Sequence, residues 1–94
     1  MKETKSLVSI IVNCHNGEKF LEQCLSSIKN QSYKNWELIF WDNKSSDNSS
    51  KIFKKFKDKR FKYFFSKKKT VLYEARNLAI KKAKGEFLAF LDVD

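Results

Sequence analysis

Four short apolar runs alternate with amphipathic segments along the chain. The runs cover residues 7–12, 36–41, 61–65 and 87–91, and their β-branched and aromatic residues favour strands. Between them, apolar residues recur at helical spacing at Phe20, Leu21, Cys24, Leu25 and Ile28, then at Ile52, Phe53 and Phe56, and finally at Ala75, Leu78, Ala79 and Ala83. The pattern predicts the order β-α-β-α-β-α-β.

Local signals refine these elements. Ser45, Ser46 and Asp47 predict the start of the second helix, because such side chains accept hydrogen bonds from free helical N–H groups. The third helix is expected from about Thr70, and Gly85 is expected to end it as a C-cap. Lys62 interrupts the third strand, which predicts a place near an edge of the sheet.

Alternating strands and helices predict an α/β, Rossmann-like fold. It would be a parallel sheet of about four strands with helices on both faces, joined by right-handed crossovers. The 94 residues are enough for one small domain, and their 41% hydrophobic content is enough for a core. Ligands of such sheets bind beyond the carboxyl ends of the strands, where the strand order reverses. The residues just after each strand are therefore the candidates for a site.

Asp92 and Asp94 follow the fourth strand and give the sharpest chemical signal. Two carboxylates one residue apart can reach a divalent cation together, and hard oxygen ligands suit Mg²⁺ or Mn²⁺ with substrate phosphates. A cation on a diphosphate would stabilise the charge of a departing nucleoside diphosphate. On its own, the pair also fits a solvated loop or a helix cap.

The other polar clusters have two readings each. Asp42 and Asn43, after the second strand, offer an acceptor and an amide for a base or a ribose, but Asp and Asn also dominate ordinary turns. His15 lies in the polar segment that starts at Asn13, and it either stacks on a base or is a loop histidine without a functional role. Arg76, early in the third helix, can reach a phosphate or form a surface ion pair with a nearby glutamate.

Several classes of site are excluded by the sequence. The glycine-rich phosphate-binding motifs G-x-G-x-x-G and G-x-x-x-x-G-K-[ST] are both absent, and two glycines cannot build either loop. A dinucleotide-binding Rossmann domain and a P-loop enzyme are therefore rejected. Without such loops, a metal and a few side chains must neutralise a diphosphate. Cys14 and Cys24 form no C-x-x-C pair, so neither a zinc site nor a disulfide is expected.

The net charge of +9 admits several partners. Nucleic acid, an anionic membrane surface and a small anionic ligand are all compatible with it, as is a lysine-rich composition without functional meaning, which is the favoured interpretation. Lys outnumbers Arg 18 to 2, whereas nucleic-acid readers favour Arg, so no nucleic-acid partner is expected. Peripheral association with an anionic membrane is the best of the functional alternatives. The chain has no signal peptide or membrane-spanning run, which predicts a cytoplasmic protein.

Taken together, these segments resemble family 2 glycosyltransferases of the GT-A fold. Residues 8–21 and 26–39 resemble the opening of that family, and residues 42–49 resemble its Asp-Asp-Gly-Ser-x-Asp-x-Thr segment. Residues 75–77 match its Ala-Arg-Asn helix, and residues 83–94 match its strand that ends in Asp-x-Asp. The resemblance covers nearly the whole chain, with the segments in the family's order and spacing.

The resemblance implies transfer of a sugar from a nucleotide-activated donor, usually with inversion, to a saccharide or lipid-linked acceptor. It implies that the base, most often uracil, is held by Asn13, His15, Asp42 and Asn43. It also implies that Arg76 approaches the base or the phosphates, that Asp92 lies near the ribose, and that Asp94, with Asp92, binds the metal.

The chain also departs from the family. Asn43 replaces a frequent second Asp, and an amide can pair with other bases than uracil; Lys44 replaces the usual Gly, and His15 stands where Tyr is frequent. Family members continue with acceptor-binding elements and a carboxylate general base, and neither is found here. Residues 1–94 are therefore expected to form an incomplete donor-binding portion with no catalytic residue and no transfer activity of its own.

Three alternatives of partner and class remain open at this point. The first is a noncatalytic nucleotide-binding or anion-binding module that kept the fold, and the second, less favoured, is a basic domain that binds nucleic acid. An unfinished sheet would also expose an edge strand, which can pair with a second copy to form a homodimer.

Overall fold

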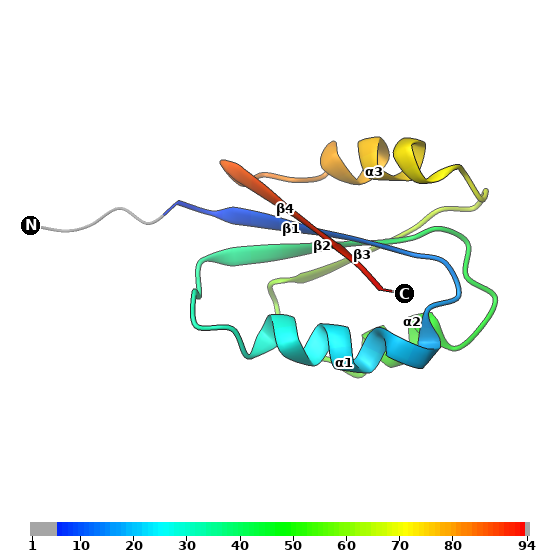
Figure 1. Cartoon of the computed structure of the whole chain (residues 1–94), viewed down its shortest axis with the longest axis horizontal. Helices are drawn as coiled ribbons and strands as arrows, with labels where there is room; N and C mark the ends of the chain where they lie inside the picture. The colour runs from blue at the N-terminus through cyan, green and yellow to red at the C-terminus, as the bar shows by residue number, and fades with distance from the viewer. Residues whose placement is uncertain (1–5, 94) are drawn as a thin grey trace, which may run out of the picture.

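The structure, a computed structural model, describes residues 6–93 and contains the seven elements in the predicted order (Figure 1). The strands are β1 (Val8–Cys14), β2 (Trp36–Asp42), β3 (Phe61–Phe65) and β4 (Phe87–Asp92). The helices are α1 (Glu18–Lys29), α2 (Ser49–Lys54) and α3 (Leu72–Ile80). Within residues 6–93, no helix is long and apolar enough to cross a membrane.

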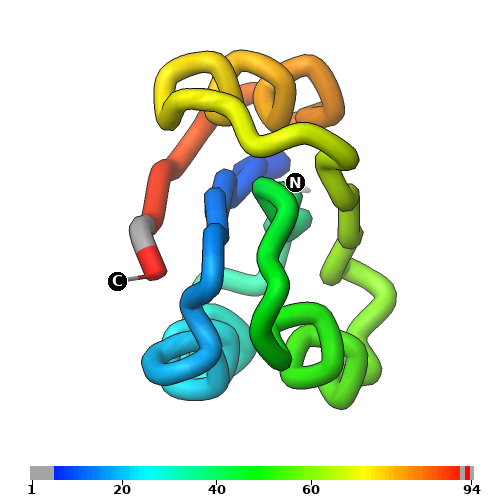
Figure 2. Tube along the Cα trace, turned by 90° about the vertical axis from the view of Figure 1, so that its right-hand side faces the viewer, coloured from blue at the N-terminus to red at the C-terminus, as the bar shows by residue number. Residues whose placement is uncertain are grey.

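All four strands are parallel, in the order β3-β2-β1-β4. Helices α1 and α2 lie together on one face of the sheet and α3 covers the other, as both views show (Figures 1 and 2). The predicted fold class and the edge position of the third strand are confirmed. Because β1 lies between β2 and β4, the chain reverses its direction of travel across the sheet there, and a ligand site is expected at the carboxyl end of β1.

Alternation along β1 divides the core between the two faces. Ile10 and Val12 pack against α1 and α2, whereas Ile11 packs against Ala75 and Ala79 of α3. All seven residues of β2 are buried, as expected for a central strand covered on both sides. The small alanines of α3 let this helix approach the sheet closely.

The prediction that Gly85 ends the third helix is wrong. Helix α3 ends at Ile80, and Gly85 has no left-handed backbone conformation. Instead its N–H donates to Ser9 Oγ at 2.8 Å, and an added Cβ would lie 2.7 Å from Ser9 N and 2.8 Å from Leu7 O. Gly85 is needed because the backbone passes directly against β1.

A buried carboxylate anchors the connection between α3 and β4 to the sheet. Glu37, only 4% exposed, accepts hydrogen bonds from the Lys84 N–H and from Ser9 Oγ, each at 2.6 Å. The Lys62 ammonium completes the cluster at 3.0 Å from Glu37 Oε1. These contacts join β1, β2, β3 and the α3–β4 connection at the amino end of the sheet, opposite the expected site.

Candidate functional site

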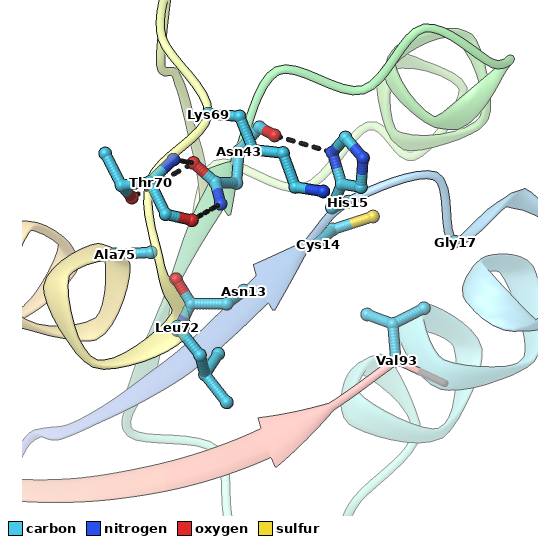
Figure 3. Close-up of a pocket in the computed structure, with 10 residues that line it drawn as sticks. All are labelled: Asn13, Cys14, His15, Gly17, Asn43, Lys69, Thr70, Leu72, Ala75 and Val93. Carbon is cyan, nitrogen blue, oxygen red and sulfur yellow. Dashed lines mark hydrogen bonds between the residues drawn. The ribbon is translucent and has the colours of Figure 1, made fainter.

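A pocket of about 290 Å³ opens at the carboxyl end of β1, where the strand order reverses (Figure 3). Its wall is formed by Asn13, Cys14, His15, Gly17, Asn43, Lys69, Thr70, Leu72, Ala75 and Val93. Three residues predicted from the sequence, Asn13, His15 and Asn43, thus meet in one pocket. Its volume lies near the lower end of the range typical of small-molecule sites.

Asn13 brings an unsatisfied acceptor into this pocket. The residue stands near the end of β1, opposite Trp41 of β2 and Asp92 of β4 in the sheet register. Its Oδ1 atom is buried and has no hydrogen-bond partner within residues 6–93. Because a buried, unpaired carbonyl oxygen costs free energy, a ligand N–H group that reached it would gain a favourable contact.

His15 and Asn43 are held by hydrogen bonds that fix what each presents. The His15 Nδ1–H donates to the Asn43 carbonyl oxygen at 2.8 Å, since a carbonyl only accepts, and His15 Nε2 lies 3.5 Å from Asn16 Nδ2. The Asn43 side chain pairs with Thr70: its Nδ2 donates to Thr70 O at 2.8 Å, and its Oδ1 accepts from Thr70 N at 3.1 Å (Figure 3). Asn43 thus ties the loop after β3 to the end of β2.

Asp42 is adjacent in sequence but lies beneath the pocket and is 0% exposed. Its Oδ1 accepts from the Ser45 N–H at 2.9 Å, and its Oδ2 accepts from the Tyr63 hydroxyl. Burial and the neighbouring Asp42 carboxylate raise the pKa of Tyr63, so the tyrosine stays a donor. In this structure Asp42 supports the turn after β2, and the predicted contact of Asp42 with a base stays a prediction.

Two loops are locked together beside the pocket. Asn16 Oδ1 accepts from Ser46 N at 2.7 Å, and Asn16 N donates to Ser45 Oγ at 2.8 Å. The expected caps of the second helix therefore serve mostly as loop contacts, and only Asp47 accepts from the first turn, at 3.0 Å from Ser49 N. Asn16 and Lys44 have φ of 53° and 56°. Asn tolerates this left-handed conformation, whereas Lys44 holds it at a position where glycine would be unstrained.

Of the remaining predicted site residues, Arg76 does not line the pocket, and the side chains of the other two lie outside what the structure describes. Arg76 is partly buried on α3, with its guanidinium 5.8 Å from the centre of the Phe90 ring of β4. Of Asp92 the backbone alone is described, and Asp94 lies outside the described residues. Within the described part of the chain, no three His, Cys, Asp or Glu side chains are grouped closely enough to hold a metal ion.

Lys69 and Thr70 are the pocket residues that the sequence reasoning missed. They follow β3, and residues after each strand of a parallel sheet gather at one edge, so the rule that selected the other loops applied equally here. The segment was overlooked because its lysines resemble an ordinary solvated run. No sequence pattern indicates that Val93 lines the pocket, because only the fold brings this apolar residue against Gly17. A Cβ added at Gly17 would lie 2.6 Å from Val93 Cγ1.

Comparison with protein families agrees with this geometry. The family model described as "Glycosyl transferase family 2" matches residues 9–94. The chain belongs to this family. Similar curated proteins include an uncharacterised glycosyltransferase of Haemophilus influenzae, 43% identical over 90 residues. The Escherichia coli protein WfgD, named as a UDP-Glc:α-D-GlcNAc-diphosphoundecaprenol β-1,3-glucosyltransferase, is 42% identical over 88 residues.

Solved structures of glycosyltransferases have the same fold. Staphylococcus aureus TarS in complex with UDP-GlcNAc superposes with a TM-score of 0.88 and 31% identity, over 93% of this chain and 26% of that chain. The mannosyltransferase PcManGT of Pyrobaculum calidifontis, with GDP-Man and Mn²⁺, gives 0.89 at 23% identity, over 97% of this chain and 28% of that chain. This second likeness concerns the fold alone.

The similarity covers this chain more fully than it covers the relatives. The Haemophilus and Escherichia proteins each match 94% of this family 2 chain, which covers 36% and 35% of their respective lengths. The chain thus spans about a third of the length of these curated relatives.

Proposed function

We propose that this chain binds the nucleotide part of a nucleoside-diphosphate sugar, in a protein that transfers the sugar to a saccharide or a lipid-linked acceptor. The observation that carries this proposal is the pocket at the end of β1, where the Asn13 oxygen is buried and unpaired. The membership of the chain in the family adds to it. A nucleobase N–H is a suitable partner for that oxygen, and the Lys69 ammonium on the same wall suits a phosphate.

The nucleotide we propose is UDP. Uracil offers an imide N–H, which is the group that the Asn13 oxygen lacks. Two relatives support this choice, because WfgD is named for UDP-Glc and TarS has been solved with UDP and with UDP-GlcNAc. Binding of the base by Asp42, and of the base or phosphates by Arg76, are parts of the same proposal.

We also propose a divalent metal, Mg²⁺ or Mn²⁺, held by Asp94 with Asp92. The register places Asp92 beside Asn13, so β4 delivers its carboxyl end to the edge where the pocket opens. Such a metal would neutralise the diphosphate and stabilise the charge of the leaving nucleoside diphosphate. Inversion at the anomeric carbon is part of the same proposal, and the family resemblance supports it.

This chain would contribute donor binding, and no catalytic base is assigned to it. A cytoplasmic location, peripheral contact with an anionic membrane, and pairing of two copies through a sheet edge complete the proposal. The name of WfgD gives an acceptor that is linked to a polyprenyl lipid, which supports the proposal that this protein acts at a membrane surface.

Thermal unfolding with Mn²⁺ and a series of nucleotides tests the proposal. UDP with Mn²⁺ should raise the melting temperature more than GDP, dTDP or phosphate do, since a ligand at 100 times its Kd stabilises by about 2.7 kcal/mol. The control is Asp94→Ala. If a metal bridges the diphosphate, this variant should lose the stabilisation, whereas simple attraction to lysines should grow when a negative charge is removed.

Two outcomes would overturn the proposal. Equal stabilisation by every nucleotide without metal would indicate a general anion-binding module. A steep loss of affinity for RNA or DNA with salt, together with no response to nucleotides, would indicate a nucleic-acid-binding domain.

A further inference from the structure

A concentration of positive charge lies on α2 and the turn that follows it. We call this the α2 basic surface and define it by Lys51, Lys54, Lys55, Lys57 and Lys59, all of which are exposed. The donor pocket does not use these lysines, because its one lysine, Lys69, comes from the loop after β3.

The charge of this surface is not neutralised locally. The single acid between residues 51 and 60 is Asp58, which pairs with Arg60 at 2.7 Å. The hydrogen bonds from Arg60 hold the pKa of Asp58 at about 2, so this carboxylate stays charged and committed to Arg60 at neutral pH. None of the five lysines forms an ion pair with any residue between 6 and 93.

Only Lys54 of these five contributes a charged contact to the fold within residues 6–93, with its ammonium 5.3 Å from the centre of the Tyr63 ring. Lys51 and Lys55 stand four residues apart, where like charges on a helix repel each other. Helix α2 has only six residues, and its attachment to the core comes from Phe53, which is buried and stacks on Phe40 with ring centres 4.5 Å apart. Lys51, Lys55, Lys57 and Lys59, on α2 and the turn after it, have no ion pair within residues 6–93 and are therefore better explained by an external anionic partner than by folding.

The position of α2 relates this surface to the pocket. At its first residue, Ser49 Oγ accepts the Gly17 N–H at 3.1 Å, and Gly17 lines the pocket. Helices α1 and α2 lie on the same side of the sheet, whereas α3 lies on the other (Figure 2). The start of α2 thus lies beside the pocket, whereas the turn that carries Lys57 and Lys59 leads into β3 at the amino end of the sheet, where the Arg60 guanidinium donates to Lys34 O at 3.1 Å.

We infer that the α2 basic surface docks the protein on an anionic lipid bilayer. The choice of a bilayer rests on the proposed function, because a lipid-linked acceptor has to be met at a membrane. Clusters of four to eight lysines on a short helix suit anionic headgroups. The apolar residues of the segment, Ile52, Phe53 and Phe56, are buried or partly buried against the core, so the attachment is electrostatic, without insertion.

Co-sedimentation of the 94-residue chain with vesicles tests this inference. We expect binding to vesicles of phosphatidylglycerol and phosphatidylcholine, no binding to phosphatidylcholine alone, and loss of binding at high salt. Each surface lysine should contribute about a fivefold gain in partitioning, so Lys51→Gln with Lys55→Gln should weaken binding roughly 25-fold. The matched control is Lys81→Gln with Lys84→Gln, which removes the same charge from exposed residues outside α2 and should weaken binding much less.

The inference is overturned if the two double variants weaken vesicle binding equally, if neither does, or if RNA competes for the same lysines more strongly than the vesicles do. Nucleotide-dependent melting of the same samples separates this result from the proposed function. If the α2 variant loses vesicles but keeps its response to UDP and Mn²⁺, both ideas stand. If UDP has no effect while vesicle binding still depends on α2, the docking surface stands and the donor proposal fails.

Discussion

At the scale of a single residue, Asn13 carries an unsatisfied polar atom at the candidate pocket. Its Oδ1 is buried without a partner, although its neighbours on β1 contribute apolar side chains to both faces of the core. An unpaired buried acceptor costs roughly 1–3 kcal/mol. The observation is most simply understood if the partner of this oxygen is a ligand.

Replacing Asn13 by Leu should therefore separate stability from binding. We expect the free energy of unfolding of the ligand-free chain to stay constant or to rise by about 1 kcal/mol, because the unsatisfied oxygen is removed. The response to UDP should fall by a factor of about ten, as for the loss of one hydrogen bond to a ligand. Chemical denaturation and nucleotide titration measure the two quantities. A destabilised variant with unchanged affinity for UDP would assign Asn13 to the fold instead.

Lys44 makes a related point about strain at the site. It holds a left-handed φ of 56° in the turn after β2, where the family frequently has glycine. The turn is maintained because Lys44 N donates to Asp42 O at 2.9 Å and Ser45 N donates to Asp42 Oδ1. The surrounding hydrogen bonds, and not the intrinsic preference of lysine, set this conformation.

At the scale of elements, the Glu37 cluster joins three strands and the connection to the fourth. Burial by itself would raise the pKa of Glu37, but the hydrogen bonds from Ser9, the Lys84 N–H and Lys62, with the charge of Lys62, lower it overall. A carboxylate with a lowered pKa in the folded state contributes stability above its ordinary pKa, here 4.5, and loses it as the pH falls through the folded value.

The change Glu37→Gln should remove this pH dependence. At pH 7 we expect a loss of about 1–3 kcal/mol, because three donors lose a charged acceptor. Below pH 4.5 the wild-type protein should itself weaken, so the difference between the two proteins should shrink. Urea unfolding from pH 7 to pH 3 measures both curves, with Glu86→Gln, an exposed residue, as the control. A difference that stays constant with pH would contradict the role given to this carboxylate.

At the scale of the whole molecule, β4 is an edge strand with exposed apolar side chains. Phe87 is 59% exposed, and Leu88, Phe90 and Leu91 are between 42% and 45% exposed. Ala89 and Leu91 also line an apolar groove of about 230 Å³ against α1. Residues 87–91 include no proline or charge of the kind that protects natural edge strands.

The chain on its own should consequently self-associate through β4, as the sequence already suggested for an unfinished sheet. We expect a concentration-dependent dimer in sedimentation velocity, and a monomer for Leu88→Lys with Phe90→Lys, because charges on an edge strand oppose pairing. Phe65→Lys on β3, the other edge, replaces a similarly exposed apolar residue and should leave the dimer intact. A wild-type chain that stays monomeric at high concentration would refute the pairing.

Much of the fold was predictable because its signals are local. The alternation of apolar runs with helical stripes predicted every element, and Lys62 predicted that β3 is an edge strand. Errors arose where a residue serves a distant contact. Glycine is a common residue at helix ends, but Gly85 is required because the backbone of β1 passes close to it. Serine is a common cap residue, but Ser45 and Ser46 form hydrogen bonds with Asn16 in the neighbouring loop.

For the site, the sequence alone determined the family, the strand ends that carry polar residues, and the net charge, since these depend on the order and spacing of residue types. The tertiary structure alone decided which residues share the pocket. It brought Asn13, His15 and Asn43 together with Lys69 and Thr70, and it placed Asp42 beneath them with both oxygens engaged. The physical reason is that hydrogen-bond satisfaction and burial depend on neighbours far away in sequence, which no local pattern records.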